Sequence, residues 1–137
     1  MIPRAVEYLF SQVKNILGQS KGNPIHGLEM IIRCNFVEIY NEQVNDLLNL
    51  SSVNLPVRWS NYDGFFAENL FIVECRQYED MMEVVQEGVS NRKVSAHELN
   101  KDSSRSHTIF TIYIDTITTD RIDGFKTTIL SVVIVSI

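Results

Sequence analysis

The run of residues 28–40, LEMIIRCNFVEIY, constrains the fold most, because its apolar residues fall on both parities of a two-residue period. Met30, Cys34 and Phe36 share one face of an extended chain, while Val37 lies on the other. A strand with one wet face alternates apolar and polar residues, whereas a strand that is apolar on both sides is covered on both. The run therefore predicts a central strand inside a layered α/β domain.

Two segments have the three- and four-residue spacing of amphipathic helices. The first begins near Pro3, where a missing backbone donor costs nothing, and Gly18 with the following turn residues is expected to end it. The second spans residues 78–89 and carries acidic residues near its start, where the helix dipole favours them. Their apolar positions are Val6, Leu9, Phe10, Val13, Ile16 and Leu17 in the first helix, and Tyr78, Met81, Met82, Val85 and Val89 in the second.

Shorter elements are expected between and after these helices. Val44, Leu47 and Leu48 suggest a short helical turn directly after the central strand. LPVRW and FFAENLFIV flank an Asp63-Gly64 pair, which supplies the positive φ that a hairpin turn needs. Strands are expected at residues 108–118 and 128–135, separated by the polar turn TTDRIDG.

Length and composition restrict the class of protein. With 137 residues and 45% apolar content, the chain fits one ordinary domain, and it shows no internal repeat or linker. A formal charge of −5 argues against nucleic-acid binding. Cys34 and Cys75 lack the close spacing of metal sites, so they are interpreted as reduced core thiols inside a cell. The apolar C-terminal ILSVVIVSI is too short to cross a membrane, and the N-terminus does not resemble a signal peptide.

Several conspicuous side chains are interpreted as structural. Glu38 lies on the apolar parity near the end of its strand and is expected to be paired or partly hydrated. His26 and His97 have no partner at metal-ligand spacing. Trp59 is expected to pack at the hairpin.

The polar run NKDSSRSH, residues 100–107, precedes an alternating apolar strand. Hydroxyl side chains compete with the backbone for hydrogen bonds, so the run is expected to form a helix-to-strand loop. Taken alone, it is compatible with an ordinary solvated loop or with a phosphorylated one.

Three segments, in this order, resemble the middle third of a kinesin motor domain: IPRAVEYLF, FVEIYNEQVNDLL and EGVSNRKVSAHELNKDSSRSHTIFTIYI. The pattern N-x-x-S-S-R-S-H is the switch I loop of that family. The resemblance covers residues 1–120, and residues 121–137 form a divergent strand-like segment. LPVRW followed by GFF resembles the kinesin-12-like branch. The matching motif positions are Asn100, Ser103, Ser104, Arg105, Ser106 and His107.

The resemblance implies a fold and a site. The fold would be a partial kinesin-type three-layer α/β structure: about half of a mixed central sheet, two main helices on one face and the other face open. Ser104 would be the magnesium-side hydroxyl, while Asn100 and Ser103 would approach the γ-phosphate of ATP and the attacking water. Arg105 would form a latch with a glutamate of the second switch, and Arg92 would lie at the base of the site.

Two other family motifs do not occur in the 137 residues. Neither the phosphate-binding G-x-x-x-x-G-K-[ST] nor the second switch, usually DLAGSE, is present. We therefore expect a fragment that does not hydrolyse ATP by itself, arising from a truncated gene model or from a genuine short product.

The resemblance also implies ATP and Mg²⁺ in the complete motor, microtubules contacted through the hairpin loop, and a place on the cytoskeleton in the cytoplasm. No nucleic acid or membrane partner is expected, and absent segments would set the oligomeric state. Two alternatives stay open: a non-catalytic module that binds microtubules or motor partners, and an unrelated α/β domain with a phosphorylatable SSRS loop.

Overall fold

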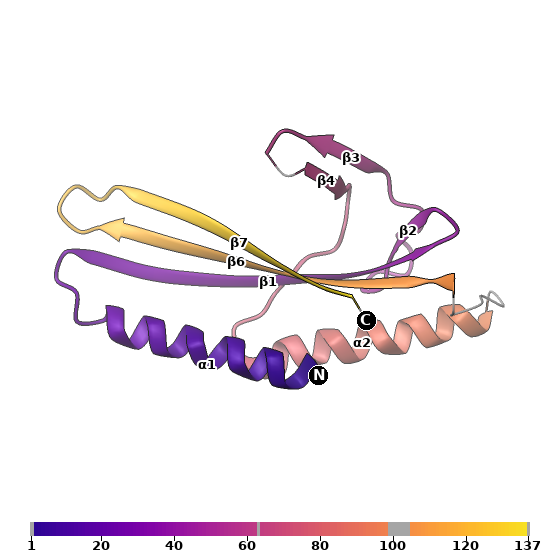
Figure 1. The fold of residues 1–137 in the computed structure, drawn as a ribbon, viewed down its shortest axis with the longest axis horizontal. Helices are drawn as coiled ribbons and strands as arrows, with labels where there is room; N and C mark the ends of the chain where they lie inside the picture. Colours follow the sequence, from indigo (N-terminus) through magenta and orange to yellow (C-terminus); the bar gives the residue numbers. More distant parts are fainter. Residues whose placement is uncertain (1, 63, 99–104, 137) are drawn as a thin grey trace.

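The computed structural model describes residues 2–62, 64–98 and 105–136. Figure 1 shows the helices along one face of a long twisted sheet, with a separate hairpin on the other side. In chain order the elements are α1 (Ile2–Ser20), β1 (His26–Tyr40), β2 (Gln43–Asp46), β3 (Val57–Ser60), β4 (Gly64–Ala67), β5 (Val73–Glu74), α2 (Tyr78–Glu98), β6 (His107–Asp120) and β7 (Lys126–Ser136). The predicted α/β class, with two main helices on one face, is confirmed.

The central position of β1 is also confirmed. The main sheet has the order β2-β1-β6-β7, and β5 pairs with a further part of β1. All described pairings are antiparallel. Phe36 of β1 lies opposite Phe110 of β6, which in turn lies opposite Val135 of β7.

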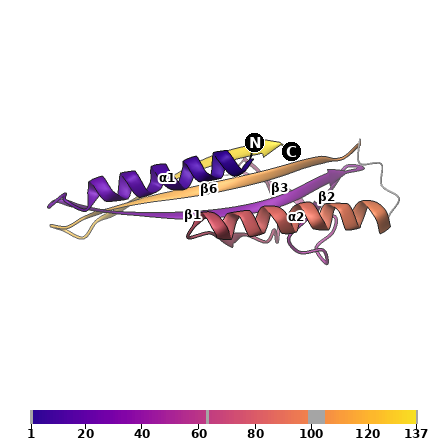
Figure 2. The ribbon, with the colours of Figure 1, turned by 90° about the horizontal axis from the view of Figure 1, so that it is seen from below.

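The core lies between the sheet and the helices. The rings of Phe36 and Phe110 meet edge to face at 5.4 Å between centroids, a favoured aromatic geometry. Figure 2, seen from the helix side, shows α1 and α2 in front of β1 and β6 and staggered along these strands, where they close this core. The buried apolar set is Val6, Phe10, Val13, Ile32, Cys34, Phe36, Leu47, Cys75, Met81, Val84, Val85, Phe110 and Ile112.

The middle of β1 is buried on both faces, as its sequence predicts. Cys34 and Phe36 face the helices, while Asn35 and Val37 on the opposite parity are 2% and 8% exposed. The Asn35 amide is satisfied there, because its Nδ2 donates to the Tyr113 hydroxyl at 2.8 Å. Beyond that patch the open face is extensive, and most apolar side chains of β7 are exposed.

The expected helical turn at Val44–Leu48 is wrong. Residues 43–46 form strand β2, which pairs with the end of β1. Asn41 and Glu42 both have positive φ, at 49° and 61°, as in a two-residue type I′ hairpin turn. This turn folds the chain straight back onto β1 before a helical turn can form.

The remaining predicted helices and strands are present, but some of them end at other residues than the sequence predicts. Helix α1 continues past Gly18 to Ser20, and α2 runs nine residues beyond Val89, to Glu98. The β3–β4 hairpin is confirmed, with Gly64 at a φ of +70°. Cys34 and Cys75 are buried free thiols, with 3.5 Å between their Sγ atoms.

Candidate functional site

The serine-rich run connects α2 to β6, as expected for a helix-to-strand loop. Asn100, Ser103 and Ser104 lie outside the described residues, so their predicted roles stay predictions. The described part of the motif is Arg105, which is exposed, followed by Ser106 and the first residue of β6.

One contact that the sequence did not predict joins two motif residues in this region. Arg92 Nη2 donates a hydrogen bond to Ser106 Oγ at 3.1 Å, and both residues are half-buried. Arg92 lies in the C-terminal half of α2, whereas Ser106 lies near the end of the loop motif. The contact therefore ties the helix to the end of the motif, while the role of Arg92 at the base of the site stays a prediction.

Helix α2 is held in place just beside Arg92. Asn91 Nδ2 donates to the Leu47 carbonyl oxygen at 2.7 Å, across 44 positions of sequence. Leu47 is itself fixed to the sheet, because its backbone N–H donates to the carbonyl oxygen of Phe36 at 2.9 Å. The chain that follows β2 thus forms a support for the C-terminal half of α2.

Asp46 holds this support together and was not singled out from the sequence. Its carboxylate is 1% exposed and accepts two backbone N–H groups, from Leu48 at 2.8 Å and from Phe71 at 2.7 Å. The Asp46 backbone N–H also donates to the Ser52 carbonyl oxygen at 3.1 Å. The buried carboxylate therefore joins the chain after β2 to the Phe71 segment, and both bonds to it are charge-assisted, while the Asp46 backbone adds the bond to Ser52.

Glu38 lies at the same end of the sheet. It is 2% exposed and lies opposite Thr108 of β6, which is fully buried. Glu38 has an interaction partner in the structure. This fits the expected structural carboxylate at the end of a strand.

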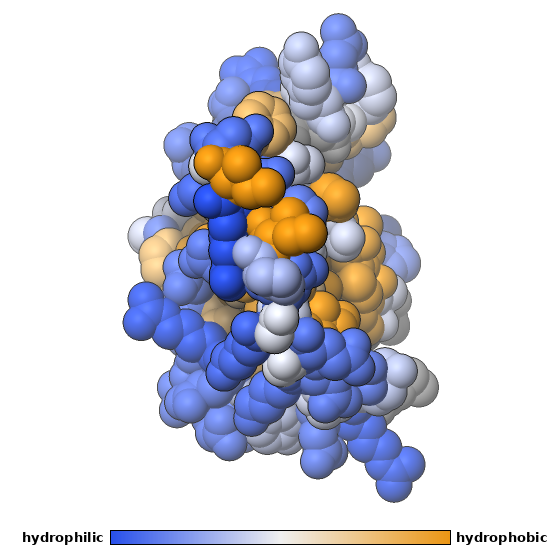
Figure 3. Space-filling view, turned by 90° about the vertical axis from the view of Figure 1, so that its left-hand side faces the viewer, coloured by the Kyte–Doolittle hydropathy of each residue, from blue (hydrophilic) through white to orange (hydrophobic). Residues whose placement is uncertain are grey.

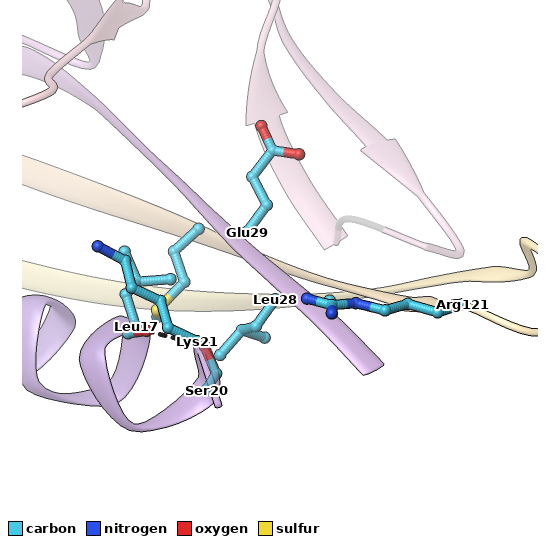
Figure 4. A pocket seen from close by; sticks show the side chains of 8 residues that line it. Leu17, Ser20, Lys21, Leu28, Glu29 and Arg121 are labelled. Carbon is cyan, nitrogen blue, oxygen red and sulfur yellow. Dashed lines mark hydrogen bonds between the residues drawn. The ribbon is translucent and has the colours of Figure 1, made fainter. Parts of the chain in front are cut away.

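A pocket of about 340 Å³ lies at the opposite end of the sheet, between the end of α1 and the start of β1. Figure 4 shows Lys21, Glu29 and Arg121 around it, with Ser20 and Leu17 from the last turns of the helix. Figure 3, which faces this end of the molecule, shows hydrophobic residues among hydrophilic ones. Of the predicted site residues that the structure describes, neither Arg92 nor Arg105 lines this pocket.

Two negative findings apply to the described part of the chain. Its His, Cys, Asp and Glu side chains form no group of three or more that could hold a metal ion. Neither α1 nor α2 is long and apolar enough to cross a membrane.

Comparisons with known proteins agree with this architecture. The family model for the kinesin motor domain matches residues 1–134. Over 115 residues the chain is 42% identical to the kinesin-like protein KIN-12E of Arabidopsis thaliana. The aligned region covers 84% of this chain and 9% of that protein. It is 47% identical over 92 residues to the mouse kinesin-like protein KIF12, covering 66% of this chain and 14% of that protein.

A solved structure of a fast kinesin matches with a TM-score of 0.78 and 30% identity, covering 98% of this chain and 35% of that one. The chain thus spans a small part of these relatives, which include kinesin-12 proteins, the branch that the hairpin sequence resembles. The expected divergence after residue 120 stays a prediction, although the family match continues into β7. This 137-residue chain belongs to the kinesin motor domain family.

Proposed function

We propose that the chain supplies the nucleotide-sensing segment of an ATP-driven microtubule motor. The observation that supports this is the 3.1 Å hydrogen bond from Arg92 to Ser106, which joins α2 to the end of the N-x-x-S-S-R-S-H motif. Loops of this kind become ordered when they contact a γ-phosphate and its Mg²⁺. A loop tied to a helix by a side-chain bond can pass that ordering to the rest of the fold.

The proposed roles follow the residue types of the motif. Serine hydroxyls are hard oxygen donors of the kind that Mg²⁺ accepts, so Ser104 would hold the ion. The ion, when bound, neutralises charge on the phosphates of ATP. Asn100 and Ser103 would orient the γ-phosphate and the attacking water, and the exposed guanidinium of Arg105 would reach an acidic partner of the second switch.

The chain alone is proposed not to hydrolyse ATP. Its sequence contains no G-x-x-x-x-G-K-[ST], the loop whose backbone amides and lysine hold the phosphates. Activity would therefore require a complete motor domain, which would act on microtubules in the cytoplasm. Purified chain should release no phosphate from ATP above a buffer blank, with or without microtubules.

The decisive experiment places residues 2–136 in a chimera, in exchange for the matching segment of an active kinesin motor domain. Ser104→Ala should lower microtubule-stimulated phosphate release by about 100-fold, the loss typical of removing one positioned group at a reacting charge. Ser11→Ala is the matched control, because its hydroxyl donates to the Tyr8 carbonyl oxygen on the exposed surface of α1. Unchanged release in Ser104→Ala, or no release from the parent chimera, would contradict the proposal.

A second candidate is a non-catalytic module that binds microtubules through the β3–β4 hairpin. The observation in its favour is the exposure of three aromatic side chains there: Trp59 at 61%, Tyr62 at 99% and Phe65 at 78%. In this case the chain should co-sediment with microtubules without nucleotide, and Tyr62→Ala should weaken pelleting. Pelleting no greater than that of an unrelated acidic protein would exclude this function.

A further inference from the structure

Helix α2 approaches β1 unusually closely at Gly88. A Cβ built on Gly88 would lie 2.1 Å from Cδ1 and 2.7 Å from Cε1 of the Phe36 ring. Side-chain carbons normally make contact at about 3.5–4.0 Å, so even one methyl group does not fit there. Figure 2 shows α2 lying along β1.

Phe36 cannot move aside to make room. It is 1% exposed, and its ring packs edge to face against Phe110, which is completely buried. Interiors are close-packed, so a displaced ring has no void to enter. A side chain at position 88 would therefore push the helix outward, by about 1.5 Å if the ring stays in place.

The next turn of the helix carries the contacts of the proposed site. Asn91 and Arg92 follow Gly88 by three and four residues, so all three lie along neighbouring positions of one helix surface. The bonds there, 2.7 Å from Asn91 to the Leu47 carbonyl and 3.1 Å from Arg92 to Ser106, are direct. Neither bond would survive an outward shift of more than about 0.5 Å in good geometry.

We infer that Gly88 and Asn91 are positioning residues for the nucleotide-sensing loop. Because Gly88 has no side chain, α2 can pack directly on Phe36, and the Asn91 amide fixes the position of α2 relative to Leu47. Together they hold Arg92 where it meets Ser106. Alanine is a better helix former than glycine, so helix propensity alone does not account for a glycine in the middle of α2. The inference rests on the proposed function, because the loop must sense nucleotide for the position of Arg92 to matter.

The test uses the same chimeric motor domain and a double-mutant cycle. Gly88→Ala should lower kcat roughly 10- to 100-fold, the usual cost of a displacement of about 1 Å at a catalytic site. If Gly88 acts through Arg92, adding Gly88→Ala to the Arg92→Ala variant should lower kcat by less than about twofold beyond Arg92→Ala alone. Losses that multiply independently would assign Gly88 a merely structural role and overturn the inference.

Matched controls complete the design. Gly18→Ala introduces the same methyl group into α1, where nothing lies within 4 Å, and should leave kcat unchanged. Phe36→Leu combined with Gly88→Ala should recover part of the lost activity, because the smaller side chain makes room for the methyl. If Gly88→Ala does not fold, as judged by circular dichroism, the cycle is run with Asn91→Ala, which adds no bulk.

The outcomes separate the two proposals. Unchanged turnover in both Gly88→Ala and Asn91→Ala, with turnover lost in Ser104→Ala, overturns the positioning role and leaves the proposed function standing. Unchanged turnover in Ser104→Ala contradicts the proposed function and removes the basis for this inference with it.

Discussion

Removal of the Asp46 carboxylate should destabilise the chain strongly. The side chain is 1% exposed and accepts two backbone N–H groups at 2.8 and 2.7 Å. A hydrogen bond to a charged group contributes about 1.5–3 kcal/mol, and a donor left unsatisfied adds its own desolvation cost. Because both bonds are only part-buried, we take the lower figure for each, which predicts a loss of about 3 kcal/mol for Asp46→Ala.

That loss is large compared with the total stability of a small domain, which is about 5–15 kcal/mol. Asp46→Asn keeps one acceptor oxygen and should lose about half as much. The free energies of unfolding would be measured by urea titration of the purified chain, followed by far-ultraviolet circular dichroism.

Asp123→Ala is the matched control, because its Oδ1 accepts the Phe125 N–H at 2.8 Å in an exposed turn. Its loss should stay within about 0.5 kcal/mol. The reasoning would be refuted if Asp46→Ala were no more destabilising than Asp123→Ala.

Three further predictions concern acid, thiols and the open sheet edge. The Arg76 backbone N–H holds the pKa of Asp80 below its ordinary value of 3.8, so the resulting stability is present above that value and is lost as the pH falls through the lowered pKa. Asp80→Asn should therefore lose less stability than the parent between pH 5 and pH 3 in urea titrations; equal losses would contradict this. The hydrogen bond with Cys75, together with burial, raises the pKa of the Cys34 thiol. The pKa of Cys75 is instead lowered by the same hydrogen bond, so burial, which leaves Cys34 0% and Cys75 2% exposed, is what protects both thiols. Alkylation of both cysteines by iodoacetamide at about pH 8 should therefore be much slower in the native chain than in urea, and comparable rates would argue against burial. The exposed edge strand β7 should lead the purified chain to self-associate in sedimentation velocity. Ile134→Lys, which places a charge where the side chain is 68% exposed, should lower that association, and an unchanged distribution would exclude β7 as the contact.

The elements with strong periodicity could be predicted from local sequence. The apolar spacing from Val6 to Leu17 specifies α1, and the two-sided apolar run of β1 specifies a central strand. The prediction of β2 failed because its turn places Glu42 at positive φ, where propensity alone would expect glycine or asparagine. The tertiary pairing with β1 overrides the local preference there.

The end of α2 and the support below it depend on distant contacts. Beyond Val89 the helix has few apolar positions, and long-range bonds from Asn91 and Arg92 hold it instead. Asp46 escaped notice because one of its partners, the Phe71 amide, lies 25 positions away. The motif reveals which residue types gather near the loop, but only the fold shows that Arg92 meets Ser106.

The hairpin also gives the molecule a built-in optical reporter. The chain has a single tryptophan, Trp59, which is 61% exposed and touches Phe65 at 4.8 Å between ring centroids, far from the buried cluster. Its emission would follow melting of β3–β4 and the arrival of anything that docks there, while staying insensitive to the core. Emission and dichroism recorded on the same sample would therefore distinguish local fraying of the hairpin from loss of the whole fold.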